Sequence, residues 1–479
     1  MNRGVTSVLL LLVFAVVLHA QKMQNATGLT LDEALAILKE NNLEIQAAKL
    51  EEKAAKENVK TVSGSHWGKL ELQQDIARSD DAGNVFGFKL TSREATFRDF
   101  GFSDFLGGVG VALNNSPDFN TFKSIMTNPQ TANQLLNTAP DDLNYPGSRN
   151  FFQTKLKYEI PLFTGFKISS YTSIMEAMAK LKALDKEKVQ KEKAYQLKKS
   201  FYDMGLLDAS ISHMKIIHKN IEILETTTQE MIKVGYAKKV DLLEVQAKKA
   251  NVERLLSQME ANKQLLYHFI SFLLNKKVDQ IIPPTKPVAM PNYTDEYILS
   301  HNVDIQKAKT GLQITKKMID AQESAYYPMV GAFAQVATAD NTFLGDAKDH
   351  EAYTVGARLS WNLFNGGIDS AKIEKAKLQK LKTATQVELA KKGIILQVAK
   401  IRTQIESLDS DIASLKKELE LANAIYENYE GRYKEHLASM SDVIIKQSQQ
   451  IEKVLKLLEV HNKRTEKIIA LEKLANGDE

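Results

Sequence analysis

Apolar residues recur at steps of three and four over most of this chain, a pattern typical of helices that pack against other helices. From Gly165 to Val234 there is no proline and a single glycine beyond the first residue, and about 70 helical residues would extend roughly 105 Å. A second long helix is predicted from Gly367 to Lys434. Its apolar positions alternate steps of four and three without a fault: Ile401, Ile405, Leu408, Ile412, Leu415, Leu419, Ala422, Tyr426, Tyr429 and Tyr433. A sustained seven-residue period demands a partner helix, so these helices are predicted to form coiled coils.

Shorter helices supply the partners. Thr30-Leu-Asp-Glu33 has the form of a capping box, and a helix is predicted to continue from it to about Val62. This helix and one from Asp241 to about Asn275, laid end to end, match the length of the first long helix. Each half of the chain is therefore predicted to form one long hairpin. In the second half the shorter helices are predicted from about Thr294 to Ser324 and from Ser441 to Leu474.

At one end of each hairpin the helical period gives way to alternation of apolar and polar residues, which predicts strands. The alternating positions are Phe152, Thr154, Leu156, Tyr158 and Ile160, then Val330, Ala332, Ala334 and Val336, then Tyr353, Val355, Ala357 and Leu359. Two strands per half are too few to close a barrel within one chain, since about eight is the usual minimum. Four open strands with an apolar face would leave unpaired edges. The sequence therefore predicts a mainly α protein with a small β part that several identical subunits complete.

The two halves of the chain are related by duplication. Asn42–Lys49 recurs as Asn302–Lys309 at an offset of 260, while Asp241–Gln246 matches Asp442–Gln447 at an offset of 201. The segment Leu162-Phe-Thr-Gly165 recurs as Leu363-Phe-Asn-Gly366 at that same offset of 201. The first half therefore carries about 59 extra residues, which we place between His66 and Leu162. We predict a first repeat at 21–282 with an insertion at about 79–150, a proline-rich linker at 283–293 and a second repeat at 294–479.

The N-terminus resembles a secretory signal at residues 1–20. Arg3 precedes an apolar run from Val8 to Leu18, and Ala20 is a plausible cleavage position. The run is shorter than the roughly 20 apolar residues that a membrane-spanning helix needs, which argues against a retained anchor. The chain has no cysteine, so it has neither a disulfide framework nor a lipid-modified cysteine. Its formal net charge of +4 is spread evenly, which argues against a nucleic-acid partner.

Aromatic residues gather where strands and helices meet. They are Trp67, Phe163, Tyr326, Tyr327, Trp361 and Phe364. Because these junctions lie at one level in a strand pair that returns to the helical side, the residues are predicted to form a belt at a membrane interface. The alternative is that they cover a soluble hydrophobic core.

In this order, duplicated and behind a signal peptide, the motifs resemble the TolC family of outer-membrane efflux proteins. The carriers are Leu29–Leu35 with Asn41-Asn42, Pro161–Gly165, Trp361–Gly367 and the turns around Gly235 and Asp442. The resemblance implies a homotrimer in the outer membrane of a Gram-negative-type bacterium. Each protomer would give four strands to a 12-stranded transmembrane β-barrel, and the helices would build a periplasmic tunnel, or α-barrel. It also implies an exit duct of a tripartite efflux or type I secretion system, which docks with a periplasmic adaptor and an inner-membrane transporter.

The two helical turns at 235–240 and 436–440 would then lie at the deep end of the tunnel, where rings of charge set selectivity and gating. Asp241 and Glu244, with Lys238 just before them, can share one helix face. The resemblance places Tyr433 and Asp442 at matching positions of the second turn. The alternative is that these acids cap helices and stabilise their first turns.

The second turn departs from the family pattern. Ala438 stands where the family has a basic residue, and Ile445 stands where it has a second acid. The family's gating contacts are therefore in doubt for this chain.

The insertion is rich in Gly, Asn and Asp and contains six phenylalanines between Phe86 and Phe105. We predict an extended outer loop that folds over the pore mouth, with disorder as the alternative. His213 and His218 do not have the spacing of a helical zinc pair, and no phosphate loop, nucleophile elbow or ligand cluster stands out. We therefore expect no cofactor, metal site or enzymatic activity. A periplasmic adaptor and an exported coiled-coil scaffold remain as alternative functions.

Overall fold

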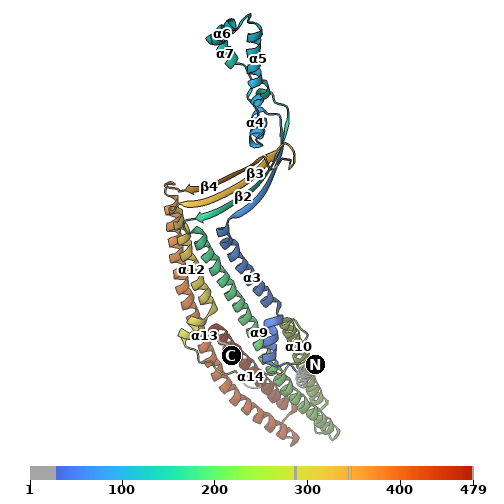
Figure 1. Ribbon diagram of the computed structural model, residues 1–479. Coiled ribbons are helices and arrows are strands. Elements are labelled where there is room, and N and C mark those ends of the chain that lie inside the picture. The colour runs from blue at the N-terminus through green and yellow to red at the C-terminus, as the bar shows by residue number, and fades with distance from the viewer. Residues whose placement is uncertain (1–27, 285–287, 344, 347, 477–479) are drawn as a thin grey trace, which may run out of the picture. The chain divides into compact units, whose positions relative to one another are not determined.

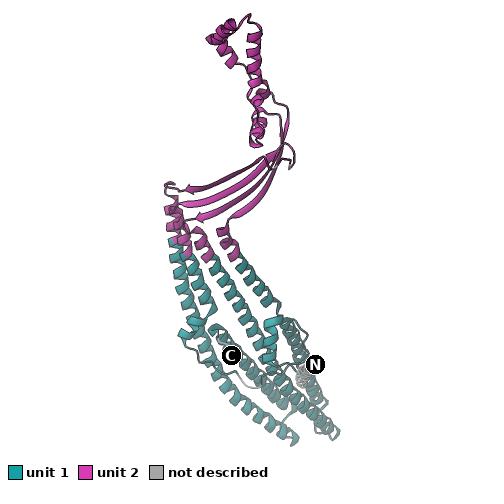
Figure 2. Cartoon of the chain, in the orientation of Figure 1, with its two compact units in different colours: residues 1–58, 174–316, 377–479 teal, residues 59–173, 317–376 magenta. Residues whose placement is uncertain are grey.

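The computed structural model describes residues 28–284, 288–343, 345–346 and 348–476 (Figure 1). The predicted signal peptide, and residues 285–287 of the predicted linker, lie outside these ranges. The chain divides into two compact units (Figure 2). The helical unit comprises Met1–Asn58, Ile174–Lys316 and Lys377–Glu479, and the strand unit comprises Val59–Ser173 and Lys317–Ala376. Each unit thus takes segments from both halves of the sequence.

The protein is mainly helical with one small sheet, as the sequence predicts. The first half contains α2 (Leu31–Asn41), α3 (Leu43–Gly64), β1 (Lys69–Ser79), β2 (Arg149–Phe163), α9 (Lys167–Lys233) and α10 (Lys239–Leu274). The second half contains α11 (Asp295–His301), α12 (Val303–Glu323), β3 (Met329–Asp340), β4 (Glu351–Ser360), α13 (Ile368–Lys434) and α14 (Met440–Ala475). In the described ranges, every helix falls short of the combined length and apolar character that crossing a membrane requires.

The helices predicted before each strand pair are interrupted once, which the sequence analysis missed. Asn42 separates α2 from α3, and its duplicate Asn302 separates α11 from α12. Asn42 Oδ1 accepts the Ile45 amide N–H at 3.0 Å, and its Nδ2 donates to the carbonyl oxygen of Leu273 at 2.8 Å. Each asparagine therefore both caps a helix and ties it to the end of another helix.

The second repeat has the same contact, in which one asparagine caps a helix and binds the end of another helix; we call this contact the asparagine joint. Asn302 Nδ2 donates to the carbonyl oxygen of Leu474 at 2.9 Å, and its Oδ1 accepts the Ile305 amide N–H at 3.1 Å. Both asparagines are buried, with 3% and 4% of their surface exposed. The repeated Asn-x-x-Ile sequence is thus a structural signature of the duplicated unit.

The helical unit is held together by apolar clusters along α9 and α13. One cluster joins α2, α9 and α10 around Leu38, Phe201 and Leu273. Another joins α9, α10, α13 and α14 through Met214, Tyr433 and other buried residues. Among the ten positions of the seven-residue pattern in α13, those at Ile401, Ile405, Ile412, Tyr426 and Tyr433 are buried. This agrees with the prediction of a coiled coil.

Ion pairs fasten α3 to α9 beside these clusters. Glu52 accepts hydrogen bonds from Lys186 Nζ and from Lys56 Nζ, each at 2.6 Å. Lys186, with Lys56 as the second cation, lowers the pKa of the Glu52 carboxyl from 4.5 to about 2. Because the ionised form is favoured in the fold, Glu52 stabilises the helical unit wherever the unfolded chain would also be ionised.

The four strands form one antiparallel sheet in the order β1-β2-β3-β4. Cross-strand partners alternate between two kinds of row. Leu72, Leu156, Val336 and Tyr353 lie in one row, and the neighbouring row contains Glu71, Lys157, Gln335 and Thr354. Because successive side chains point to opposite faces, the sheet has one apolar face and one polar, charged face. This confirms the predicted alternation.

The prediction of an extended or disordered insertion is wrong. The chain between β1 and β2 forms α4 (Ala82–Thr91), α5 (Phe102–Asn114), α6 (Phe119–Thr127), α7 (Pro129–Leu136) and α8 (Asp141–Asn144). Its Asp and Asn residues act as helix caps: Asp81 accepts the Asn84 amide N–H at 3.0 Å, and Asp118 accepts that of Thr121 at 2.9 Å. Capping and turn formation favour the same residue types, so composition alone suggested a loop.

We predict that Asn42→Ala and Asn302→Ala each destabilise the protein by about 1–3 kcal/mol, because each leaves a buried carbonyl and a helix N-terminus without a partner. Thermal unfolding of the detergent-solubilised protein measures the effect. Asn41→Ala, at the neighbouring position, is the matched control and should leave the midpoint nearly unchanged. Equal unfolding midpoints for all variants would contradict a stabilising role of the two asparagines.

We predict that the advantage of the wild type over Glu52→Gln is complete above pH 4.5. It should shrink as the pH falls from 4.5 towards about 2, because the folded pKa of Glu52 lies near 2. Thermal unfolding at pH 7 and at pH 3 measures the difference. Glu40→Gln, an exposed acid of α2, is the control. An advantage that stays constant over this range would contradict the assignment.

Candidate functional site

The turn between α9 and α10 and the turn between α13 and α14 are built alike. In the first, Gly235 has a φ of +83° and the Tyr236 amide N–H donates to the Met231 carbonyl oxygen at 2.8 Å. In the second, His436 has a φ of +63° and the Leu437 amide N–H donates to the Arg432 carbonyl oxygen at 2.7 Å. Both are Schellman endings, in which a left-handed residue satisfies the last carbonyls of the helix.

These two turns, which we call the paired turns (residues 234–244 and 432–446), contact one another. The ring of Tyr236 stacks on the ring of His436 with centroids 4.4 Å apart. Tyr433 is buried, and its hydroxyl donates to Thr228 Oγ1 of α9 at 3.4 Å. Burial raises the pKa of Tyr433, and the negative charge of Asp241 adds to this effect. The structure therefore brings Tyr433 and Asp241 together, although they come from different repeats.

Two of the predicted acids act as helix caps. Asp241 Oδ2 accepts the Lys238 amide N–H at 2.7 Å at the start of α10. Asp442 and Ser439 form a reciprocal capping box at the start of α14, in which Asp442 Oδ2 accepts from Ser439 Oγ at 2.6 Å. The hydrogen bond from Ser439 lowers the pKa of Asp442. The capping interpretation therefore holds for both acids, while Glu244 takes no part in either cap.

The second turn does have cations, at positions that the sequence analysis missed. Arg432 and Lys446 lie near the Tyr429 ring, at 5.5 and 5.4 Å from its centroid, and both favour the charged form of Asp442. Lys446 follows Asp442 by one helical turn, so its spacing could have revealed it. Arg432 approaches only because the chain reverses at His436.

Some buried polar atoms of this bundle have no hydrogen-bond partner among the described residues, including the Tyr426 hydroxyl and both amide atoms of Gln447. Gln447 is fully buried. A buried polar group without a partner costs about 1–3 kcal/mol. Packing of α14 next to the paired turns therefore carries this energetic cost.

The sheet is the second candidate functional element. Leu72, Tyr353 and Val355 on its apolar face are 71%, 81% and 73% exposed. The opposite face carries ion pairs, such as that of Lys155 Nζ with Asp75 Oδ2 at 2.8 Å. Within the described part of the chain, β1 pairs with β2 alone and β4 pairs with β3 alone, so both edges of the sheet are open.

The predicted belt aromatics lie where the strands meet the helices. Trp361 Nε1 donates to the Tyr326 carbonyl oxygen at 3.1 Å, and the Trp67 carbonyl oxygen accepts from the hydroxyl of Tyr158 at 2.7 Å. Phe166 was missed; its ring contacts those of both Phe163 and Tyr327 edge to face. Trp67, Tyr326, Tyr327, Trp361 and Phe364 are exposed.

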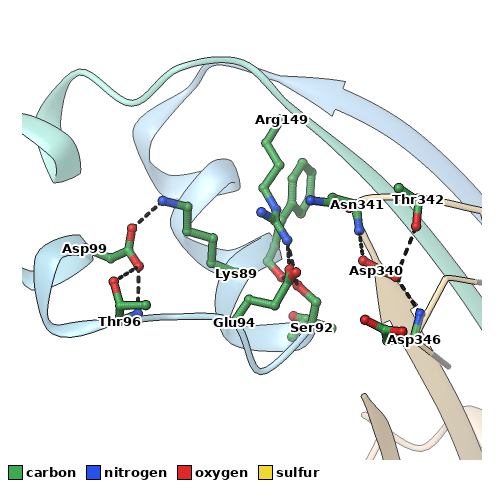
Figure 3. A network of polar contacts seen from close by, with 12 residues as sticks. Lys89, Ser92, Glu94, Thr96, Asp99, Arg149, Asp340, Asn341, Thr342 and Asp346 are labelled. Atoms are coloured by element: carbon green, nitrogen blue, oxygen red, sulfur yellow. Dashed lines mark hydrogen bonds and ion pairs between the residues drawn. The ribbon is translucent and has the colours of Figure 1, made fainter. Parts of the chain in front are cut away.

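A polar network fixes the base of the insertion to the sheet (Figure 3). Arg149 of β2 forms an ion pair with Glu94 and donates to Ser92 Oγ at 3.1 Å. Ligand atoms of Glu94, Asp340 and His350 lie within 4.8 Å of one another. Because the guanidinium of Arg149 already neutralises Glu94, and Asp340 accepts the Asp346 amide N–H at 2.9 Å, we interpret the cluster as a structural fastening.

Sequence comparison matches the second repeat to a known protein family. Residues 296–477 match the model of the outer membrane efflux protein family. The chain is 21% identical over 238 residues to MdtQ of Escherichia coli (strain K12), described as a putative multidrug resistance outer membrane protein. The match covers 48% of this chain and 49% of that protein, so the chain spans about half the length of the curated relatives it matches.

Structural comparison extends the likeness to nearly the whole chain. CusC superimposes with a TM-score of 0.73 and 13% identity, over 94% of this chain and 92% of CusC. VceC, an outer membrane protein of Vibrio cholerae, gives a TM-score of 0.71 and 13% identity, over 93% and 96% of the two chains. The open outer-membrane channel MtrE of Neisseria gonorrhoeae gives 0.69 and 13%, over 93% and 89%.

These likenesses agree with the duplicated hairpins, the four-stranded sheet and the paired turns. The second repeat therefore matches the outer membrane efflux protein family in sequence, and the described residues share the fold of CusC and VceC.

Proposed function

We propose that this protein is an outer-membrane exit duct of a tripartite efflux or type I secretion system. Three copies close their sheets into one barrel, and the helices continue the duct through the periplasm. A periplasmic adaptor and an inner-membrane transporter deliver the substrate, which the duct conducts passively. The names of the relatives, which describe outer-membrane and multidrug-resistance proteins, support this proposal.

The amphipathic sheet with two open edges is the observation that carries the proposal. An exposed apolar face with unpaired edges is a liability for a lone chain. Both problems disappear when β4 of one copy pairs with β1 of the next, because the edges are then paired and the apolar face meets lipid. The polar face then lines the water-filled duct, and the junction aromatics lie at the lipid boundary. The alternative functions, a periplasmic adaptor or an exported scaffold, do not account for an exposed apolar face with two open edges.

The paired turns form the gate in this proposal. Asp241, Glu244 and Asp442 of three copies place acids around the constriction, with Lys238 beside them and Tyr433 on the inner side of the bundle. The capping roles of Asp241 and Asp442 do not exclude a second role, since a capping carboxylate keeps its charge. Opening splays the turns apart and separates contacts such as Tyr236 with His436.

We predict that Leu72→Lys prevents assembly in the membrane, because a lysine on the lipid face costs about 2–4 kcal/mol near the bilayer centre and the trimer carries three copies. Gln73→Lys, on the adjacent residue and the opposite face, is the matched control and should assemble normally. The yield of heat-modifiable oligomer in outer-membrane fractions measures both. Equal yields would exclude a lipid-facing role for the apolar face.

We predict that Glu244→Gln lowers the preference of the channel for cations by roughly a factor of two, because it removes one acid per copy from the constriction without touching a cap. Reversal potentials across planar bilayers under a salt gradient measure the preference. Glu296→Gln, an exposed acid at the start of α11, is the control. An unchanged reversal potential would leave the tip acids as helix caps alone.

A further inference from the structure

The distal helices of the insertion, α5, α6 and α7, have no core of their own. None of their residues is buried in the described chain. Several of their large apolar side chains are exposed: Leu106 is 50% exposed, Val111 60%, Leu113 52%, Phe119 72% and Leu136 74%. Three short helices without a buried residue do not bury enough apolar surface to offset their ordering. Another surface must cover them.

The exposed side of α5 is shaped for close helix packing. Phe102, Leu106 and Leu113 recur at helical spacing on one side of α5, and all three are exposed. A side chain built at Gly107 or Gly110 would meet nothing within 4 Å, whereas one at Gly108 would lie 2.5 Å from Leu135. Gly108 therefore packs inside the insertion, while Gly110, next to the Phe102–Leu106–Leu113 side, leaves the backbone of α5 open to a neighbour.

The charges of the distal part argue against a membrane surface as this neighbour. Between Gly101 and Tyr145 there is one cation, Lys123, and four acids: Asp104, Asp118, Asp141 and Asp142. Helices that lie on membranes carry lysine and arginine on their polar face and are attracted to anionic lipids. A negative segment lacks this attraction, which favours a protein surface over a lipid surface as its partner.

Connectivity places identical copies within reach, on the basis of the proposed function. The insertion joins the end of β1 to the start of β2, at the ends of these strands away from the helix junctions. A barrel of three such sheets, with strands about 4.8 Å apart and tilted about 40°, has a backbone diameter of about 24 Å. An α-helix with its side chains is about 10–12 Å wide. Three copies of α5 therefore fit side by side over one barrel mouth.

The base of the insertion is held firmly enough to present these helices. Besides the Arg149 network, Lys89 of α4 forms an ion pair with Asp99 (Figure 3), and the ring of Phe88 stacks on that of Phe151 with centroids 4.3 Å apart. α4 is thus anchored to the start of β2. Exposed apolar side chains also occur on this base, at Leu90, Phe97 and Phe100, but α4 has a buried residue, Val85, whereas α5, α6 and α7 have none.

We propose that the distal helices of three copies pack against one another through the Phe102–Leu106–Leu113 side of α5 and form a cap over the outer mouth of the duct. The partner of this surface is a second copy of the same chain. The cap buries the exposed apolar side chains and restricts entry from outside the cell.

Cysteine cross-linking tests the cap, since the natural chain has no cysteine to interfere. Leu106→Cys and Leu113→Cys are each expressed in the full-length protein and treated in intact membranes with a short bismaleimide. We expect covalent dimers in both, at several times the yield given by Gln134→Cys, an exposed polar position of α7. Two positions are used so that the result does not depend on one variant that misfolds.

Three results would overturn the cap. The first is an assembled oligomer without dimers at either position, which leaves the proposed duct intact. The second is an equal yield for Gln134→Cys, which shows random collision. The third is quenching by spin-labelled lipids of a fluorophore attached to the new thiol of the Leu106→Cys variant, which shows that the membrane covers this surface. Absence of any oligomer from wild-type membranes would overturn the cap and the duct together.

Discussion

The open edges of the four-stranded sheet are the constraint on which the proposed function depends. One face of the sheet is apolar and exposed, the other carries charges, and β1 and β4 have unpaired backbone groups at their outer edges. A single chain cannot satisfy these groups, because four strands do not close. In the proposed assembly, pairing between copies would satisfy them, and the two faces of the sheet would then separate lipid from water. In this proposal, the pairing that completes the sheet is also the pairing that forms the duct.

In the helical unit, long helices pack against helices that are shorter than they are. Each long helix needs a continuous partner surface, but the partner consists of separate shorter helices. Asn42 and Asn302 make the joint by capping one helix and binding the last carbonyls of another. A polar side chain is tolerated there, although buried, because both ends of its amide are satisfied. Salt bridges such as Lys186 with Glu52 add to the pairing of α3 with α9.

In the proposed function, the same residues of the paired turns have both a structural and a gating role. Asp241 and Asp442 start helices and lie where two hairpins meet. Positive charge is supplied by Arg432 and Lys446, close to the aromatic ring of Tyr429, and position 438 carries an alanine. The buried amide of Gln447, in the same bundle, has no hydrogen-bond partner among the described residues.

The amino-acid sequence by itself determined the long helices, the strands, the side of each strand that is apolar, and the turn positions, because each depends on periodicity or on residues close in the chain. The tertiary structure decided which carbonyls the joint asparagines bind, 231 and 172 residues away, and which cations face Asp442. It also decided that the insertion is helical, since its Asp and Asn residues serve as caps as readily as turns. Contacts between distant residues depend on the register of the packed hairpins, which local patterns do not contain.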